Sequence, residues 1–290
     1  MMSNELKGVL LAIGATVGWS LSGVFVRFVP TIDPWTFNAY RGASMSCALL
    51  LWMLLRYRGE IFSHFRQATP IPLIATAGFF GIGSSLYILA MQQASVAAVS
   101  CVAATSPLFA ALLAWVWLGE RTRLVVLLAI FVALGGVAIV AFGESGASLS
   151  GLYGSLVALL VALCFAGQSV TLRRYHAVEM APSLIIGGFG IFLVVSLTVG
   201  LKAISLNEFL ILAGMGTVQL ALPLVLYMRG ARYVPAVQMV LISLADAVLN
   251  PFWVWLVHGE VPVESVYWGG LMILGAIAAA TWPRRRTATA

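Results

Sequence analysis

Two ionisable side chains lie inside long apolar stretches of the sequence, where a charge is costly and marks a candidate functional residue. Asp246 lies in the middle of one stretch, and Arg41 lies about 10 Å inside the outer end of another, at 1.5 Å per helical residue. An arginine at this depth could bind a carboxylate, and an aspartate could bind an ammonium group or exchange a proton. Because their depths differ by roughly 6 Å, the two could instead form an ion pair, or Arg41 could extend toward the nearer surface.

Neutral polar side chains occur at similar depths in other apolar stretches. A single residue of this kind forms a hydrogen bond between helices more often than it contacts a ligand. As a set, however, they predict a cavity that is polar but nearly uncharged, which suits a zwitterionic or neutral metabolite. The candidate substrate-binding residues are Trp19, Asn38, Arg41, Ser84, Tyr87, Gln168, Gln219 and Asp246.

Trp19 differs from the other eight tryptophans in its depth. Those eight lie near the ends of apolar stretches, where indole rings settle at the level of the lipid headgroups: Trp35, Trp52, Trp115, Trp117, Trp253, Trp255, Trp268 and Trp282. Trp19 lies at the centre of its stretch, where its N–H needs a partner or a wet cavity. It either lines a substrate site or packs between helices.

The elements that hold these residues are predicted by composition. Hydrophobic residues make up 61% of the chain and charged residues 9%, against about 45–50% and about 25% in soluble domains. Apolar runs of about 18 residues or more indicate membrane-spanning helices, and they are too long and too evenly apolar for β-barrel strands. The first run resembles a signal peptide but is long, and we expect it to be retained. The sequence predicts an all-α integral membrane protein with ten spans, at 8–29, 34–55, 70–93, 95–118, 123–142, 150–172, 181–202, 207–231, 235–257 and 263–282.

The net charge of +6 reflects orientation rather than affinity for nucleic acid. If the amino terminus is cytoplasmic, thirteen of the sixteen Lys and Arg residues fall on the inner side and two, Arg27 and Lys202, on the outer side. This is the positive-inside pattern of membrane proteins. An even number of spans places both termini in the cytoplasm, and a bacterial inner membrane is the expected location.

Nearly the same phrase occurs twice, as WVWLGE at 115–120 and as WVWLVHGE at 253–260. Aligning the two Gly-Glu pairs gives an offset of 140, which also pairs Tyr87 with Tyr227, Trp115 with Trp255 and Gly135 with Gly275. An offset of 146 pairs Gly8 with Gly154, Trp19 with Phe165, Val24 with Val170 and Arg27 with Arg173. These series predict a duplicated five-helix unit, residues 1–146 and 147–290.

Because five is odd, the second unit must insert in the opposite orientation. Arg121 and Arg123 follow the first Gly-Glu pair, on the inner side, whereas Val261 and Val263 occupy the matching outer positions. Inverted repeats are typical of secondary transporters, which hold their substrate where the halves meet. The alternative is that duplication only builds a stable bundle.

Helix-breaking residues mark the expected moving parts of such a protein. Proline removes a backbone donor and permits a kink, and breaks at matching places in both halves point to the binding site. A static kink that improves packing is the alternative at each position. The candidate break or gating residues are Gly78, Gly83, Pro107, Pro223 and Pro251.

Three segments carry a resemblance to a known family. The run LYILAMQQASVAAVSCVAATSPLFAALLAWVWLGE, together with WSLSGVFVRFVP and DPWTFNAYRG, resembles the EamA type of the drug/metabolite transporter superfamily. The resemblance covers all ten spans. It implies a ten-helix inverted-repeat transporter that exports small metabolites, most similar to the bacterial amino-acid exporters, including the aromatic amino-acid exporter. The second half departs from the pattern, with Pro251 one turn later than Pro107 predicts and Asp246 in mid-helix.

The predicted function is therefore secondary export of small neutral or aromatic amino acids or metabolites by alternating access. A sugar-phosphate or nucleotide-sugar antiporter would need several cations deep in the membrane, and only Arg41 is available. A cationic drug exporter would favour a deep carboxylate in the first helix; that helix has none, although Asp246 could take this role. We predict no enzyme, because no histidine is buried and only one aspartate is deep, and no channel filter is visible.

The expected partners are a small-molecule substrate, the lipid bilayer and, as candidate coupling ions, protons. No nucleic acid and no obligate protein partner is predicted. The three cysteines and three histidines show no metal-ligand spacing, so neither a metal nor a cofactor is expected.

Overall fold

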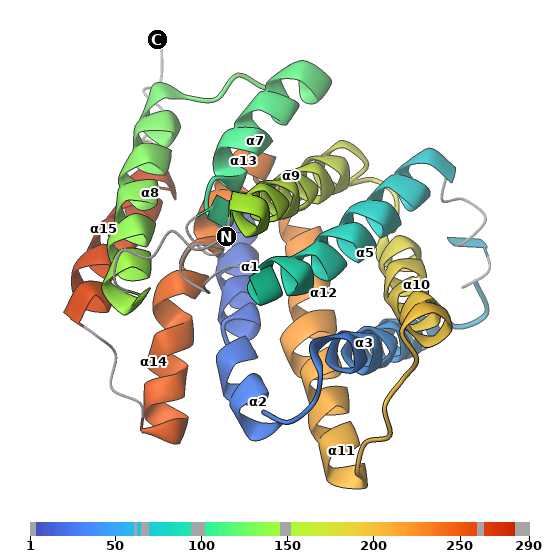
Figure 1. Cartoon of the computed structure of the whole chain (residues 1–290). Helices are drawn as coiled ribbons and strands as arrows, with labels where there is room; N and C mark the ends of the chain where they lie inside the picture. The colour runs from blue at the N-terminus through green and yellow to red at the C-terminus, as the bar shows by residue number, and fades with distance from the viewer. Residues whose placement is uncertain are drawn as a thin grey trace.

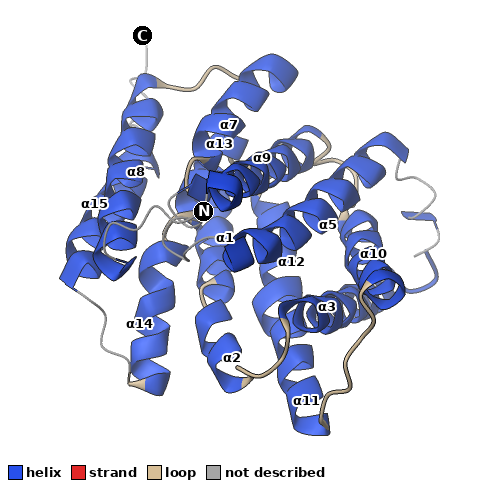
Figure 2. Ribbon diagram, viewed as in Figure 1, coloured by secondary structure: helices blue, strands red, loops and turns tan. Residues whose placement is uncertain are grey.

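The computed structural model describes residues 4–60, 63–64, 70–93, 102–145, 152–259 and 264–281, and every regular element among them is a helix (Figure 2). The first half contains α1 (Asn4–Trp19), α2 (Ser22–Phe28), α3 (Pro34–Tyr57), η1 (Arg58–Glu60), α5 (Pro70–Gln93), α7 (Ser106–Leu113), η2 (Ala114–Leu118) and α8 (Leu124–Ser145). The second half contains α9 (Leu152–Arg174), α10 (Ala181–Thr198), α11 (Leu206–Gly214), η3 (Met215–Ala221), α12 (Leu222–Gly230), α13 (Ala236–Ser243), α14 (Asp246–His258) and α15 (Glu264–Thr281).

Most of these helices are apolar enough to cross a membrane. Six described segments have both the length and the composition for it, and three shorter apolar helices accompany them: Asn4–Phe28, Pro70–Tyr87, Val157–Arg174, Ala181–Thr198, Leu206–Gly230 and Ala236–His258, then Ser106–Leu118, Leu124–Ile139 and Tyr267–Ala280. With α3, they make ten helical segments in the described part of the chain. Large apolar side chains face outward, such as Leu55 (72% exposed) and Leu197 (77% exposed). The chain is an all-α integral membrane protein.

Helices of the two halves pack against one another in a regular pattern. Numbered along the chain, the first segment contacts the eighth (α1 with α12), and the sixth contacts the third (α9 with α5). The second pair is obtained from the first when each segment is replaced by the one five places away in the other half. The pairs α3 with η3 and α10 with α5 exchange in the same way, as do α7 with α9 and α13 with α1. The pairs α3 with α10, α7 with α13, and α8 with α15 join segments that are five places apart, so the same replacement leaves each pair unchanged. In Figure 1, α8 and α15 form one edge of the bundle.

Two helices of different halves break at matching positions. The helix leading into α7 is interrupted by a turn at 104–105, and the one leading into α14 by a turn at 244–245, which is 140 residues later. The helices that follow end at Gly119 (φ 69°) and Gly259 (φ 73°), again 140 residues apart. A left-handed residue at this point ends a helix and is readily adopted only by glycine. The repeated Trp-rich phrase is therefore the end of a broken helix.

The first segment is also broken, at Ser20 and Leu21, between α1 and α2. Side chains from the second half bind the groups that this break exposes. Gln219 Nε2 donates to the Trp19 carbonyl (3.1 Å), and the Gly23 N–H donates to Asn250 Oδ1 (3.1 Å). Because an unsatisfied backbone group in hydrocarbon costs several kcal/mol, these bonds fix the break against η3 and α14.

Trp253 has a structural role that the sequence did not predict. We expected it to anchor the helix end at the membrane interface, but its Nε1 donates to Ser20 Oγ at the break (2.9 Å). Trp115 and Trp268, 58% and 62% exposed, keep the outward position expected of interface residues.

Replacing Asn250 with leucine tests the link between the first and ninth segments. Asn250→Leu removes the acceptor of the Gly23 N–H and the donor to Ser22 Oγ. We expect it to lower the free energy of unfolding by about 1–3 kcal/mol, measured as the midpoint of thermal unfolding in detergent. Asn207→Leu at an exposed position of α11 is the control, and an equal effect of both variants would contradict the assigned role.

Candidate functional site

A cavity of about 210 Å³ lies where α1, α5, α9, η3 and α12 meet. Its wall is mainly aromatic, and it is called the aromatic cavity from here on. Ser84 and Gln168 add polar groups, and Gly83, Val161, Leu220 and Leu224 complete the wall. The six aromatic residues of the wall are Trp19, Phe79, Phe80, Tyr87, Phe165 and Tyr227.

Trp19 stands at the centre of an aromatic cluster on one side of the cavity. Its ring centroid lies 5.0 Å from that of Tyr227 and 6.1 Å from that of Phe165, and the last two lie 6.2 Å apart. Such tilted and edge-on pairs are favourable arrangements of aromatic rings. The Tyr227 hydroxyl is held by Ser169 Oγ at 2.8 Å. Trp19 therefore both lines the cavity and packs between helices.

The cavity wall contains residues that the predicted repeat pairs with one another. At the offset of 140 residues, Tyr87 corresponds to Tyr227, and both line the cavity; at the offset of 146, Trp19 corresponds to Phe165, and both line it. The wall also contains the pairs Phe80 with Leu220 and Ser84 with Leu224. Residues from before and after the predicted repeat boundary thus line the same cavity.

A buried polar cluster adjoins the cavity through Ser84. Arg41 Nη2 donates to Asn38 Oδ1 at 2.9 Å and to Ser84 Oγ at 3.3 Å, and the Ser84 hydroxyl donates to Asn38 Oδ1 at 2.9 Å. Asn38 is 1% exposed, and its Nδ2 and the Nε of Arg41 are buried without a hydrogen-bond partner. Arg41 therefore points into the protein rather than toward the membrane surface.

Asp246 belongs to another helix, α14. The break at 244–245 places it in the first turn of α14, whereas the sequence indicated only the middle of a span. A carboxylate is favoured at a helix N-terminus by the helix dipole, yet its Oδ1 is buried without a partner. The ion pairs between described residues, such as Glu120 with Arg173 (3.3 Å) and Asp33 with Lys202 (3.6 Å), do not include Arg41 with Asp246. The two candidate charges do not neutralise each other here.

The two glutamines of the candidate set have different positions. Gln168 is 6% exposed and lines the aromatic cavity. Gln219 is 4% exposed and holds the Trp19 carbonyl, while its Oε1 has no partner. The cavity thus brings together Trp19, Ser84, Tyr87 and Gln168.

Sequence reasoning missed four of the six aromatic residues of the wall, which are Phe79, Phe80, Phe165 and Tyr227. Phe165 and Tyr227 were visible as repeat partners of Trp19 and Tyr87, and this pairing was the available signal. Phe79 and Phe80 gave no such signal, because a phenylalanine in an apolar helix has the same appearance whether it faces lipid, a neighbouring helix or a cavity.

The glycines and prolines predicted to break helices act in different ways. The helix α5 is continuous through Gly78 and Gly83, so neither breaks it. Gly83 instead allows close packing, because a Cβ there would lie 3.0 Å from the Cβ of Cys164. Pro107 lies in the first turn of α7, directly after a break, where its missing N–H costs nothing.

The remaining prolines also need a revised interpretation. Pro223 begins α12 after the π-helical segment η3, so its helix is distorted there without being interrupted. The break of the ninth segment lies at 244–245, where i→i+3 hydrogen bonds form a tight turn, and Pro251 lies inside α14. Pro251 is therefore not the interruption that the sequence indicated.

In the described part of the chain, apolar helical segments surround a cavity, which is an arrangement that membrane transporters use. Comparisons with known proteins agree. Residues 6–142 match the model of the EamA-like transporter family. Over these residues the chain is similar to EamA-type transporters of the drug/metabolite transporter superfamily.

Relatives cover nearly the whole chain. The pseudopaline exporter CntI of Pseudomonas aeruginosa, in strains UCBPP-PA14 and PAO1, is 29% identical over 294 residues, which is 96% of this chain and 98% of that protein. A protein crystal structure superposes with a TM-score of 0.82 at 20% identity, over 94% of this chain and 96% of the other. The last match shows that the fold is shared over almost its full length.

Close packing of α1 against α12, next to the cavity, can be tested with one pair of alanine substitutions. A Cβ at Gly18 would collide with the Pro223 ring, whereas a Cβ at Gly78 would meet nothing within 4 Å. We expect Gly18→Ala to destabilise the protein by about 1–3 kcal/mol through overpacking. Gly78→Ala should be neutral or stabilising, because alanine is the better helix former. Thermal unfolding in detergent measures both, and equal midpoints would contradict this packing.

Proposed function

We propose that this chain exports small neutral or aromatic amino acids, or metabolites of similar chemistry, from the bacterial cytoplasm by alternating access. The observation that carries the proposal is the aromatic cavity at the place where the two halves of the chain meet. Secondary transporters with inverted repeats hold their substrate at such a position, near the middle of the membrane. Flat aromatic walls suit planar or apolar side chains.

We infer that the halves are residues 1–146 and 147–290. The reciprocal helix contacts, the two breaks 140 residues apart and the two left-handed glycines support this division. The EamA-like family match ends at residue 142, close to the proposed boundary. Because each half contributes five segments, the second half would run in the opposite direction through the membrane.

The size and lining of the cavity favour a small solute over a drug-sized molecule. Its volume of about 210 Å³ lies below the range of about 300–1,000 Å³ that is typical of drug-sized ligands. The described wall contains no Lys, Arg, Asp or Glu. A sugar phosphate would require several cations, and a cationic drug would require a carboxylate. That a similar protein is named as an exporter of pseudopaline supports the direction of transport.

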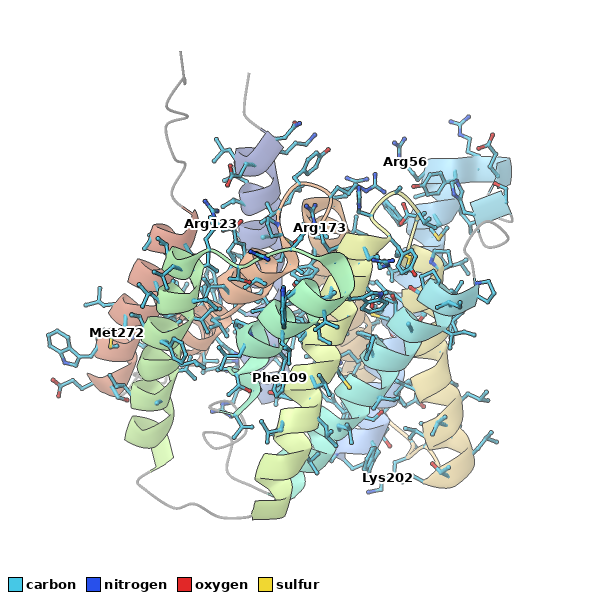
Figure 3. All side chains as sticks on the ribbon, turned by 90° about the horizontal axis from the view of Figure 1, so that it is seen from above. Arg56, Phe109, Arg123, Arg173, Lys202 and Met272 are labelled. Atoms are coloured by element: carbon cyan, nitrogen blue, oxygen red, sulfur yellow. The ribbon has the colours of Figure 1, made fainter. Side chains whose placement is uncertain are left out.

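The distribution of basic residues supports a cytoplasmic location for one end of the bundle. Arg56, Arg123 and Arg173 lie at the same end, and Lys202 lies at the opposite end (Figure 3). The arginine-rich end would face the cytoplasm by the positive-inside rule. Export would then require the aromatic cavity to open first toward the arginine-rich end and then toward the end that carries Lys202.

Flux in proteoliposomes tests the role of the cavity. We expect Trp19→Ala to raise the half-saturating concentration of a labelled aromatic amino acid up to about tenfold, because a contact between two aromatic rings contributes roughly 0.5–1.5 kcal/mol beyond the burial of their surface. Trp268→Ala, on the lipid-facing surface at 62% exposure, is the control and should leave the concentration unchanged. Wild-type kinetics in Trp19→Ala, at equal protein incorporation, would assign Trp19 to packing alone.

A second flux measurement tests proton coupling through Asp246. If its buried carboxylate carries the proton, Asp246→Asn should abolish uptake driven by a pH gradient and preserve substrate exchange without a gradient. Glu264→Gln, at the exposed start of α15, is the control. Gradient-driven flux that persists in Asp246→Asn would exclude Asp246 as the coupling group.

A further inference from the structure

The polar cluster beside the aromatic cavity contains a partly buried cation, Arg41, and an excess of buried hydrogen-bond donors. We propose that Arg41 and Asn38 form a carboxylate-binding subsite of this cavity, so that the transported molecule must carry a carboxylate. This inference rests on the proposed export function, and it narrows the substrate to acids and zwitterions. Amines, amides and uncharged aromatic compounds are then excluded.

The start of α3 holds the two residues in place. Asp33 caps the helix by accepting from the Thr36 N–H at 3.1 Å, and the Lys202 N–H donates to Thr36 Oγ1 at 3.2 Å. Burial alone would raise the pKa of Asp33, but the Thr36 bonds and the Lys202 charge outweigh burial and lower that pKa. The cap is therefore ionised at neutral pH. Residues three apart share one helix face, so Asn38 and Arg41 face α5 together.

Hydrogen bonding fixes which way the Asn38 amide points. Arginine is a donor only, so the Asn38 atom 2.9 Å from Arg41 Nη2 must be the oxygen. That oxygen also accepts from Ser84 Oγ at 2.9 Å. Its two lone pairs are then used, and the Asn38 amide nitrogen faces away from both partners. It is buried and without a hydrogen-bond partner.

The unused groups of the cluster are all donors. They are the Nδ2 of Asn38 and the Nε of Arg41, both buried and without a partner. A buried, unpaired charge and unpaired donors are costly, and protein interiors normally supply an acceptor. Here the described residues place no carboxylate within ion-pair distance of Arg41. A bound carboxylate would accept from both groups and neutralise the guanidinium.

The subsite is continuous with the aromatic cavity. Ser84 belongs to both, because it lines the cavity and accepts from Arg41 at 3.3 Å. Tyr87, one turn further along α5, lines the same cavity. A solute whose carboxylate binds Arg41 and Asn38 would direct the rest of the molecule past Ser84 and into the aromatic wall. This geometry fits a small molecule with one carboxylate and one apolar or aromatic group.

The test measures binding to the purified full chain in detergent, separately from transport. The probes are L-tryptophan, L-tryptophan amide and indole-3-propionate, which share the indole and differ in the carboxylate and the ammonium group. We expect the amide to bind at least about 30-fold more weakly than L-tryptophan, since removal of one partner from a buried charge pair has an effect of this size. Indole-3-propionate should retain carboxylate-dependent binding.

Two variants of the subsite and one control complete the design. Arg41→Gln should weaken the binding of L-tryptophan and of indole-3-propionate at least about 30-fold and leave the binding of L-tryptophan amide unchanged. Asn38→Asp is a second test that stays valid if Arg41→Gln fails to fold. Its new carboxylate should pair with Arg41 and so weaken the binding of both carboxylate probes, without loss of thermal stability. Arg56→Gln, at the exposed end of the same helix, should bind all three probes as the wild type does.

Each result separates the subsite from the proposed function. Equal binding of L-tryptophan and its amide, or no binding of either carboxylate, would overturn the subsite, even if proteoliposomes transport amino acids. Carboxylate binding that depends on Arg41 and Asn38, without flux in proteoliposomes, would support the subsite and overturn export of these solutes.

Discussion

Inside a bilayer, every backbone polar group must find its partner within the protein, because no water is present to replace it. This constraint makes the described chain almost wholly helical, and it determines where a helix is allowed to break. The first segment breaks at Ser20 and Leu21, and side chains from other segments bind the exposed groups. Gln219 holds the Trp19 carbonyl, and Asn250 holds the Gly23 amide. Both partners come from the second half of the chain, so the break itself joins the halves.

The same constraint shapes the cavity. Its wall is mostly aromatic, and the polar groups nearby are largely satisfied by one another, as in the cluster of Arg41, Asn38 and Ser84. The exceptions are buried polar atoms without a hydrogen-bond partner. They indicate where a ligand could bind, because such an atom costs free energy unless a ligand supplies the partner. Around Arg41 these exceptions are donors, and at Asp246 the exception is an acceptor.

The two halves have kept matching backbone features and changed their chemistry. Both retain a break and a left-handed glycine at the offset of 140 residues. At the first residue after the break, however, one half carries Ser106 and the other carries Asp246. Close contacts of α1 with α12 and of α9 with α5 use a glycine on the equivalent member of each pair: Gly18 packs on Pro223, and Gly167 packs on Phe79. Packing is thus preserved symmetrically, whereas charge is not.

The sequence by itself determined the class of protein and most of its helical spans, because the hydrophobicity of a spanning helix follows directly from the thickness and polarity of the membrane. The division into two repeats stays a prediction. The prediction of an all-α integral membrane protein is confirmed, and the structure places Trp19, Ser84, Tyr87 and Gln168 in one cavity wall. Only the tertiary structure decided that α5 is unbroken at Gly83, that Pro251 is not the break, and that Arg41 bonds to Asn38 and Ser84. Helix rotation and packing set these contacts, and a uniformly apolar sequence contains little periodicity from which rotation can be determined.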